Sequence, residues 1–282
     1  LKAIAVRGYK GITISNYEEF IEAVKEAYDT LLLVGKNYVE NIRTYGTSIT
    51  VEYTSAAGNL PTKNFQMGVF PSVEKINNIA LKQVVLRNIS CYACPLYCGK
   101  ISAVKEGSYK GTIVRGPEYE TIACCGSNCW NDDLKVIIKV NHLCNEYGLD
   151  TITMGDSIAF VMECFERGIL TKKDTDGIDV KWGDGEAMIN IVHKVAGREG
   201  IGDILAEGVR RASEIIGKGA EKLAIHVKGL ELPGYDPRGM QATALGYLTG
   251  DRGGCHLRAY LIAPEIVSIP QLKNRFETKG KA

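Results

Sequence analysis

The sequence predicts a mainly α-helical fold with minor β-structure. Apolar residues recur three and four positions apart in several windows between residues 16 and 216, which is the period of an amphipathic helix. Glycines follow most of these windows, and short polar residues precede several of them, as expected at helix ends. Apolar alternation is confined to short stretches. The 282 residues are 45% hydrophobic and 24% charged, an ordinary globular composition for one large or two small domains.

The first ninety residues predict three elements. Residues 1–8 favour a short strand that ends at Gly8. Asn16 is a good helix start, and apolar side chains at 21, 24, 28 and 31 then fall on one helical face. The same spacing at 76, 79, 80 and 84 predicts a second helix that runs into Cys91. Gly and Pro residues mark a loop around 58–65.

Four helices are predicted in series after residue 130. The first begins at residues 131–133 and ends at Gly148, and the second begins at Asp156 and ends at Gly168. The third spans the apolar positions 188–195, and the fourth runs from Asp203 to Gly217 as one helix. Residues 223–227 alternate and predict a strand. A composition change over 217–222 predicts the internal boundary.

Charge and hydropathy exclude several classes of partner. The chain has 34 Lys+Arg and 33 Asp+Glu, a formal charge of +1, so the sequence predicts no nucleic-acid or anionic-membrane partner. No apolar run approaches the ~20 residues of a membrane helix. Nine cysteines are too few for a disulfide scaffold, and no secretory signal opens the sequence. We therefore expect a cytoplasmic protein whose thiols are reduced and available to bind metal.

Three cysteines form the most informative motif. Cys91, Cys94 and Cys98 have the spacing C-x2-C-x3-C. Thiolates at this spacing on a tight turn can hold three corners of a 4Fe-4S cluster, with a fourth ligand from elsewhere. A structural zinc site is the alternative, with the fourth ligand from the cysteines at 124, 125 and 129. Three buried structural thiols are the third interpretation.

Several motifs, taken in order, resemble one enzyme family. They are residues 1–8 (LKAIAVRG), 60–65 (LPTKNF), the cysteine motif, 116–121 (GPEYET), 144–151 (CNEYGLDT), 228–239 (KGLELPGYDPRG) and 252–260 (RGGCHLRAY). Together they resemble the tungsten-containing aldehyde:ferredoxin oxidoreductases. The resemblance implies helical domains 2 and 3 of that fold. Residues 1–13 would close a β-rich N-terminal domain that is otherwise absent, 14–218 would form the middle domain, and 219–282 would begin the C-terminal domain.

The resemblance implies cofactors and the residues that bind them. Family members hold tungsten, or molybdenum, between two pyranopterins beside one 4Fe-4S cluster. Cys91, Cys94 and Cys98 would bind the cluster, with its fourth ligand beyond residue 282. The first pterin motif, D-x-x-G-L-D, matches residues 145–150, where an asparagine replaces the first aspartate. Its pterin-binding residues would be Asn145, Gly148, Leu149 and Asp150. Arg238 is a further candidate, because its guanidinium can hold a phosphate or carboxylate.

The resemblance also implies an active site. Glu118 would act as general base on water, with Glu120 as the nearby alternative. His256 and Tyr235 would line the substrate pocket. The implied reaction oxidises a small aldehyde to a carboxylic acid and passes electrons through the cluster to ferredoxin, in a possible homodimer. Two alternatives stay open: an aromatic thioester (benzoyl-CoA-type) reductase of the same family, and a non-catalytic, metal-stabilised helical fragment.

Overall fold

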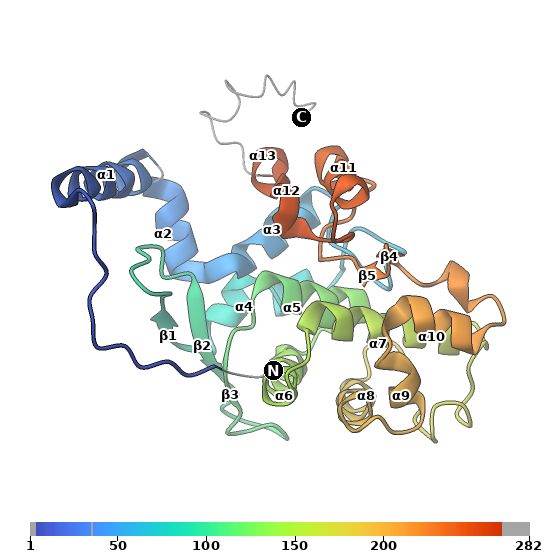
Figure 1. Ribbon diagram of the computed structural model, residues 1–282. Helices are drawn as coiled ribbons and strands as arrows, with labels where there is room; N and C mark the ends of the chain where they lie inside the picture. The colour runs from blue at the N-terminus through green and yellow to red at the C-terminus, as the bar shows by residue number, and fades with distance from the viewer. Residues whose placement is uncertain (1–3, 35, 267–282) are drawn as a thin grey trace.

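The computed structural model describes residues 4–34 and 36–266, and within them it confirms a mainly α-helical fold (Figure 1). Three helices, α5 (Tyr119–Cys125), α6 (Leu134–Tyr147) and α7 (Thr151–Glu166), lie at the centre of the molecule. Around them lie α1 (Tyr17–Asp29), α2 (Lys36–Tyr45), α3 (Thr50–Ala56), α4 (Asn78–Lys82), α8 (Gly185–Gly197), α9 (Ile201–Leu205), α10 (Gly208–Ile216), α11 (Gln241–Thr249), α12 (His256–Ala259) and α13 (Ile262–Ile266).

Capping residues fix the ends of α6, and a glycine allows α5 and α7 to pack closely. The Asp133 side chain accepts from the Lys135 N–H to begin α6, and Gly148 ends it in the left-handed conformation, as predicted. Helices α5 and α7 then pack closely, since a Cβ atom on Gly155 would lie 2.6 Å from the Cys124 backbone carbonyl carbon. The axes of these helices therefore approach only because residue 155 lacks a side chain.

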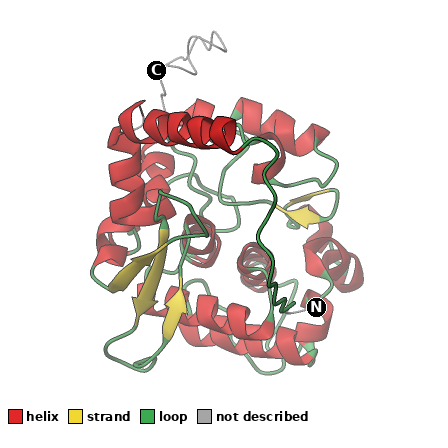
Figure 2. Ribbon diagram, turned by 60° about the vertical axis from the view of Figure 1, so that its left-hand side comes forward, coloured by secondary structure: helices red, strands yellow, loops and turns green. Residues whose placement is uncertain are grey.

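A small antiparallel sheet lies beside the helices, in the order β1 (Val85–Ile89), β2 (Gly99–Ala103), β3 (Ile113–Arg115) (Figure 2). Ile101 of β2 is paired with Arg87 of β1 and with Arg115 of β3. Lys100 and Ser102, which alternate with Ile101, are buried. One face of the sheet therefore covers the core and the other faces outward. A second, two-stranded pairing joins β4 (His226–Val227) to β5 (Leu230–Glu231).

Five predicted elements differ from the structure, one of which is the strand predicted over residues 223–227, reduced to β4 at His226–Val227. Of the strand predicted over residues 1–8, residues 1–3 lie outside the described residues. Residues 4–8 are exposed and form no strand, because no described strand lies beside them to accept their backbone hydrogen bonds. The helix predicted to reach Cys91 ends at Lys82, and the chain continues as β1, whose pairing with β2 outweighs helical periodicity. Helix α7 begins at Thr151 with Asp150 as its cap, so Asp156 lies inside the helix and not at its start. Residues 201–216 form two helices, broken before Gly208 at φ +80°.

One hydrophobic core includes residues from both sides of the predicted boundary at 217–222, among them Ile137, Phe160, Leu223 and Met240. The division into domains 14–218 and 219–282 stays a prediction.

Helix α1 follows its predicted start at Asn16 but buries none of its residues. Within the described ranges, no helix combines the length and apolar character that crossing a bilayer requires.

Candidate functional site

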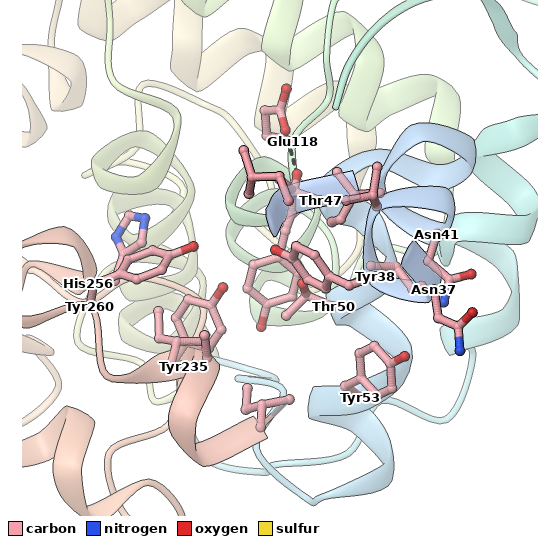
Figure 3. A pocket seen from close by; sticks show the side chains of 18 of the residues that line it. Asn37, Tyr38, Asn41, Thr47, Thr50, Tyr53, Glu118, Tyr235, His256 and Tyr260 are labelled. Atoms are coloured by element: carbon pink, nitrogen blue, oxygen red, sulfur yellow. Dashed lines mark hydrogen bonds between the residues drawn. The ribbon is translucent and has the colours of Figure 1, made fainter. Parts of the chain in front are cut away.

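A cavity of about 1060 Å³ opens beside the first turn of α5 (Figure 3). Helices α2 and α3 supply one side, and α12 and α13 supply another. Most of its lining is apolar or aromatic, and the polar groups are few. Glu118, Glu120, Tyr235 and His256 all border this cavity, so the structure brings the predicted catalytic residues together from three separate segments of the chain. A large apolar cavity with a few convergent polar groups is the usual form of a small-molecule site.

Glu120, Tyr235 and His256 form one wall of the cavity. The Nε2 atom of His256 lies 3.4 Å from the Oε1 atom of Glu120, and the His256 ring lies 6.0 Å from the Tyr235 ring. The Gly234 N–H donates to Glu120 Oε2 over 2.6 Å, which fixes the carboxyl group. Glu120 Oε1 is buried and makes no hydrogen bond within the described residues. This oxygen is therefore left to His256 or to a molecule in the cavity.

Burial keeps the side chains of Glu120, His256 and Tyr235 uncharged near pH 7. It raises the pKa of the Glu120 carboxyl to about 8, although the Gly234 N–H opposes the shift, and the charge of Asp150 adds to it. Burial and the charge of Arg252 lower the pKa of His256 to about 4. Burial and the neighbouring Glu120 raise the pKa of Tyr235. Near pH 7 the wall therefore presents a neutral carboxyl, a neutral imidazole and a phenol, which can donate and accept protons without a fixed charge.

Glu118 has different neighbours from Glu120. It occupies the cap position of α5, and its Oε2 accepts a hydrogen bond of 2.5 Å from Thr47 Oγ1. Thr47 in turn accepts from the Tyr119 N–H over 2.9 Å. In Figure 3 Glu118 lies beside Thr47 and away from Tyr235 and His256. Burial, with the nearby Glu118 carboxylate, raises the pKa of the Cys98 thiol.

The cysteine motif is the loop between β1 and β2. Two of its residues, Ala93 and Tyr97, have positive φ angles, a conformation that bends the chain between the cysteines. Side chains from two helices hold its carbonyls: Tyr28 Oη donates to Ala93 over 2.9 Å, and Arg43 Nη2 donates to Pro95 over 2.8 Å. Cys91 is exposed, and Cys94 and Cys98 are half-buried. The loop is thus fixed through its backbone, and its Cys91 sulfur also accepts a hydrogen bond of 3.9 Å from Arg115 Nη2.

The three thiols of this loop are the ligand type that a 4Fe-4S cluster takes. Among the described residues, no three His, Cys, Asp or Glu side chains converge closely enough for one metal ion. A cubane takes each thiolate on a different iron, so its ligands stand farther apart than those of a zinc ion. The three candidate ligands of the zinc alternative, Cys124, Cys125 and Cys129, are all buried, and Cys125 and Cys129 donate to backbone carbonyls.

The predicted pterin motif forms the turn between α6 and α7. Gly148 ends α6 at φ +73°, and Asp150 caps α7 by accepting from the Thr153 N–H over 2.9 Å. Asn145 and Asp150 are exposed, and Leu149 is half-buried. The charge of Asp150 acts on both Glu120 and His256, so the turn lies near the polar wall of the cavity. Exposed oxygen acceptors at this place fit the N–H edge of a pterin.

Arg238 is already engaged by the protein. Its guanidinium forms an ion pair of 2.5 Å with Asp236 and also donates to the Phe65 carbonyl. Its side chain is still 65% exposed, but it does not line the cavity. Thr47, Tyr38 and Tyr53 also line the cavity and lie outside the quoted motifs, and Tyr260 lines it from the end of the motif 252–260. Single threonines and tyrosines carry no spacing signal, and only the packing of residues 38–53 against α12 brings them together.

Comparison with known proteins defines the class. The family described as "Aldehyde ferredoxin oxidoreductase, domains 2 & 3" matches residues 22–282. The chain therefore belongs to the aldehyde ferredoxin oxidoreductase family. It is 39% identical over 275 residues to the tungsten-containing aldehyde ferredoxin oxidoreductase of Thermococcus kodakarensis, and 40% identical over 278 residues to that of Pyrococcus abyssi. Each match covers 96% of this chain and 44% of the relative, so the chain spans less than half of their length.

A solved structure shares the fold. It is the active-site complex BamBC of benzoyl coenzyme A reductase in complex with 1,5-dienoyl-CoA, with a TM-score of 0.68 and 24% sequence identity. The match covers 88% of this chain and 39% of that one. At this identity the comparison supports the helical architecture alone.

Proposed function

We propose that this chain forms the substrate pocket of a tungsten-dependent oxidoreductase that converts a small aldehyde to a carboxylic acid. The observation that carries the proposal is the meeting of Glu120, Tyr235 and His256 on one wall of an otherwise apolar cavity. Family membership supports the reaction class, and the names of the relatives support the metal. We further propose ferredoxin as electron acceptor, a cytoplasmic location and a homodimeric assembly.

The reaction assigns tasks to the residues of the pocket. An aldehyde and one water give a carboxylic acid, two protons and two electrons. A tungsten or molybdenum bis-pyranopterin, when bound, supplies the two-electron acceptor, and a 4Fe-4S cluster passes the electrons on singly. The polypeptide has to hold the apolar part of the aldehyde, orient its carbonyl and accept a proton from water.

His256 is placed to orient the carbonyl of the aldehyde, and Glu120 is placed to accept a proton from water. A neutral imidazole donates one N–H, and with a pKa of about 4 His256 keeps this form at physiological pH, so it can hydrogen-bond the carbonyl oxygen. Glu120 in its ionised form accepts the proton from water, which general-base catalysis requires. Its pKa of about 8 predicts that this form becomes abundant only on the alkaline side of neutrality. We therefore assign the general-base role to Glu120 in preference to Glu118.

Glu118 and the remaining candidates have supporting roles in this proposal. Glu118 fixes Thr47 and the first turn of α5 between the pocket and the cysteine motif. Cys91, Cys94 and Cys98 hold three corners of the cluster, and residues 145–150 hold one pterin through Asn145, Gly148, Leu149 and Asp150. Arg238 fixes the loop 233–239 through Asp236, which orients Tyr235 at the pocket.

The test uses the full-length protein, purified without oxygen from its source cells. We expect about one tungsten or molybdenum and about four irons per chain, together with reduction of a small redox dye on addition of an aldehyde. Zinc alone, or no metal, would overturn the proposal in favour of a metal-stabilised helical fragment. Loaded protein that turns over an aromatic thioester but no aldehyde would establish the reductase alternative.

A further inference from the structure

The outward face of the β1–β3 sheet carries two arginines in one row. Arg87 and Arg115 are both paired with Ile101, and residues paired across antiparallel strands share a face. Both arginines are exposed, and Ile113 on the same face is 56% exposed. This row forms an apolar strip flanked by guanidinium groups, a combination that is enriched at protein interfaces. Arg87, Ile101, Ile113, Arg115 and the nearby Tyr92 are called the sheet patch below.

The sheet patch lies in a basic part of a chain whose charges otherwise balance. Residues 75–105 contain five basic residues and no Asp or Glu. Two of the five are occupied, because Lys75 pairs with Asp132 and the buried Lys100 ammonium donates to the Arg43 and Tyr97 carbonyls. Within the part of the chain that the structure describes, Arg87 and Arg115 form no ion pair with a carboxylate. No carboxylate therefore compensates the charge of either arginine, although Arg115 also donates to the Cys91 sulfur.

The sheet patch adjoins the cysteine motif. Strand β1 ends at Ile89, two residues before Cys91, and Tyr92 is fully exposed. The Nη2 atom of Arg115 lies 3.9 Å from the Cys91 sulfur. Among the three cysteines of the motif, Cys91 is the exposed one. A protein bound to the sheet patch would thus lie directly against the most accessible edge of the proposed cluster.

We propose that the sheet patch is the docking surface for a small, acidic, one-electron carrier protein. This inference rests on the proposed function, since the carrier takes electrons from a cluster held by Cys91, Cys94 and Cys98. An acidic partner is favoured because uncompensated arginines steer negatively charged surfaces and an aromatic anchor such as Tyr92 fills the centre of the contact. Each docked carrier accepts one electron, so two carriers are reduced for each aldehyde oxidised.

The test measures binding of an acidic ferredoxin, in its oxidised form, to the cofactor-loaded, full-length protein. Titration calorimetry at two salt concentrations compares wild type with Arg87→Glu and, as a second variant, Tyr92→Ala. The matched control is Lys173→Glu, the same charge reversal at an exposed lysine in the segment between α7 and α8. Iron content and melting temperature show that each variant is folded and loaded.

We expect Arg87→Glu to raise the Kd about five- to ten-fold at low salt and to reduce its salt dependence, because the reversal replaces attraction with repulsion. Tyr92→Ala is expected to raise the Kd without changing the salt dependence, and Lys173→Glu to leave both unchanged. Unchanged binding by Arg87→Glu and Tyr92→Ala, or an equal loss in Lys173→Glu, would overturn the proposal. So would a change in oligomeric state with unchanged ferredoxin binding, because the face would then be a contact between copies.

A separate readout distinguishes this proposal from the function on which it rests. Reduction of a small dye by aldehyde needs no docking surface. If wild type shows no such reduction, the proposed function is wrong. If wild type reduces the dye and binds ferredoxin regardless of the charge at residue 87, the docking surface is wrong and the proposed function stands.

Discussion

His256 Nε2 and Glu120 Oε1 lie 3.4 Å apart at the wall of the cavity, although the two residues come from the N-terminal turns of two different helices. The pair distinguishes Glu120 from Glu118, which lies two residues earlier and hydrogen-bonds Thr47. Residues two apart do not face the same way on a helix. The structure therefore gives different neighbours to two carboxylates that the sequence leaves as alternatives.

The first prediction concerns the rate of aldehyde oxidation. We expect Glu120→Gln to lower kcat by about 100-fold or more, in the range that a general base contributes. Glu118→Gln keeps an acceptor for Thr47 and should lower kcat by less than about ten-fold. Steady-state kinetics with a dye acceptor, at equal metal content, measures both. A larger loss in Glu118→Gln than in Glu120→Gln would return the role to Glu118.

The second prediction concerns stability and pH, measured by urea unfolding of wild type and Glu120→Gln without cofactors. The folded pKa of Glu120, about 8, is above its value of 4.5 in the unfolded chain. The folded state therefore binds the extra proton between these values, and the stabilisation is full below pH 4.5 and lost as pH rises through 8. The stability difference, wild type minus variant, should fall by roughly 3 to 5 kcal/mol across this window. A difference independent of pH would show that Glu120 is ionised in the folded protein.

The third prediction concerns the cysteine motif. We expect Cys98→Ser to lose most of the bound iron and the visible absorption of the cluster, because a serine oxygen is a poorer ligand for iron than a thiolate. Cys144→Ala is the control, since Cys144 is buried in α6 away from the β1–β2 loop. Iron analysis after anaerobic purification compares the two. Equal iron in Cys98→Ser and wild type would exclude Cys98 as a ligand.

The fourth prediction concerns the pterin motif. Asp150→Asn keeps the cap of α7, because asparagine caps helices as well as aspartate does. It removes the negative charge proposed to accept from pterin N–H groups. We expect lower tungsten content with unchanged iron content and melting temperature, measured by elemental analysis and calorimetry. Retention of full tungsten would show that Asp150 only caps the helix.

The fifth prediction concerns the contact between α5 and α7. A methyl group at residue 155 would overlap the Cys124 backbone, so Gly155→Ala should destabilise the fold by about 1–3 kcal/mol, as overpacking does. Gly197→Ala in α8 would meet only the flexible Glu199 side chain at 3.1 Å, and its gain in helix propensity should offset that contact. Urea unfolding compares the two variants. Similar stabilities would mean that the helices separate at low cost.

The sequence by itself determined the helical class and several helix boundaries. It placed the ends of α6 at Asp133 and Gly148 and the start of α1 at Asn16, because capping residues act through local hydrogen bonds. It also identified the family and the cysteine motif, since motif spacing is a property of the chain alone. The candidates Glu118, Tyr235 and His256 came from the same motifs, and all three border one cavity.

Only the tertiary structure decided the rest. The run at 76–84 has helical spacing, yet the chain leaves the helix at Lys82 because β1 pairs with β2. Asp156 resembles a helix start, yet it lies buried inside α7, where the cap at Asp150 sets the register. The choice between Glu118 and Glu120 depends on which neighbour each carboxylate meets. Those neighbours, Thr47 and His256, come from distant segments, and contacts between distant segments are fixed by packing and not by local pattern.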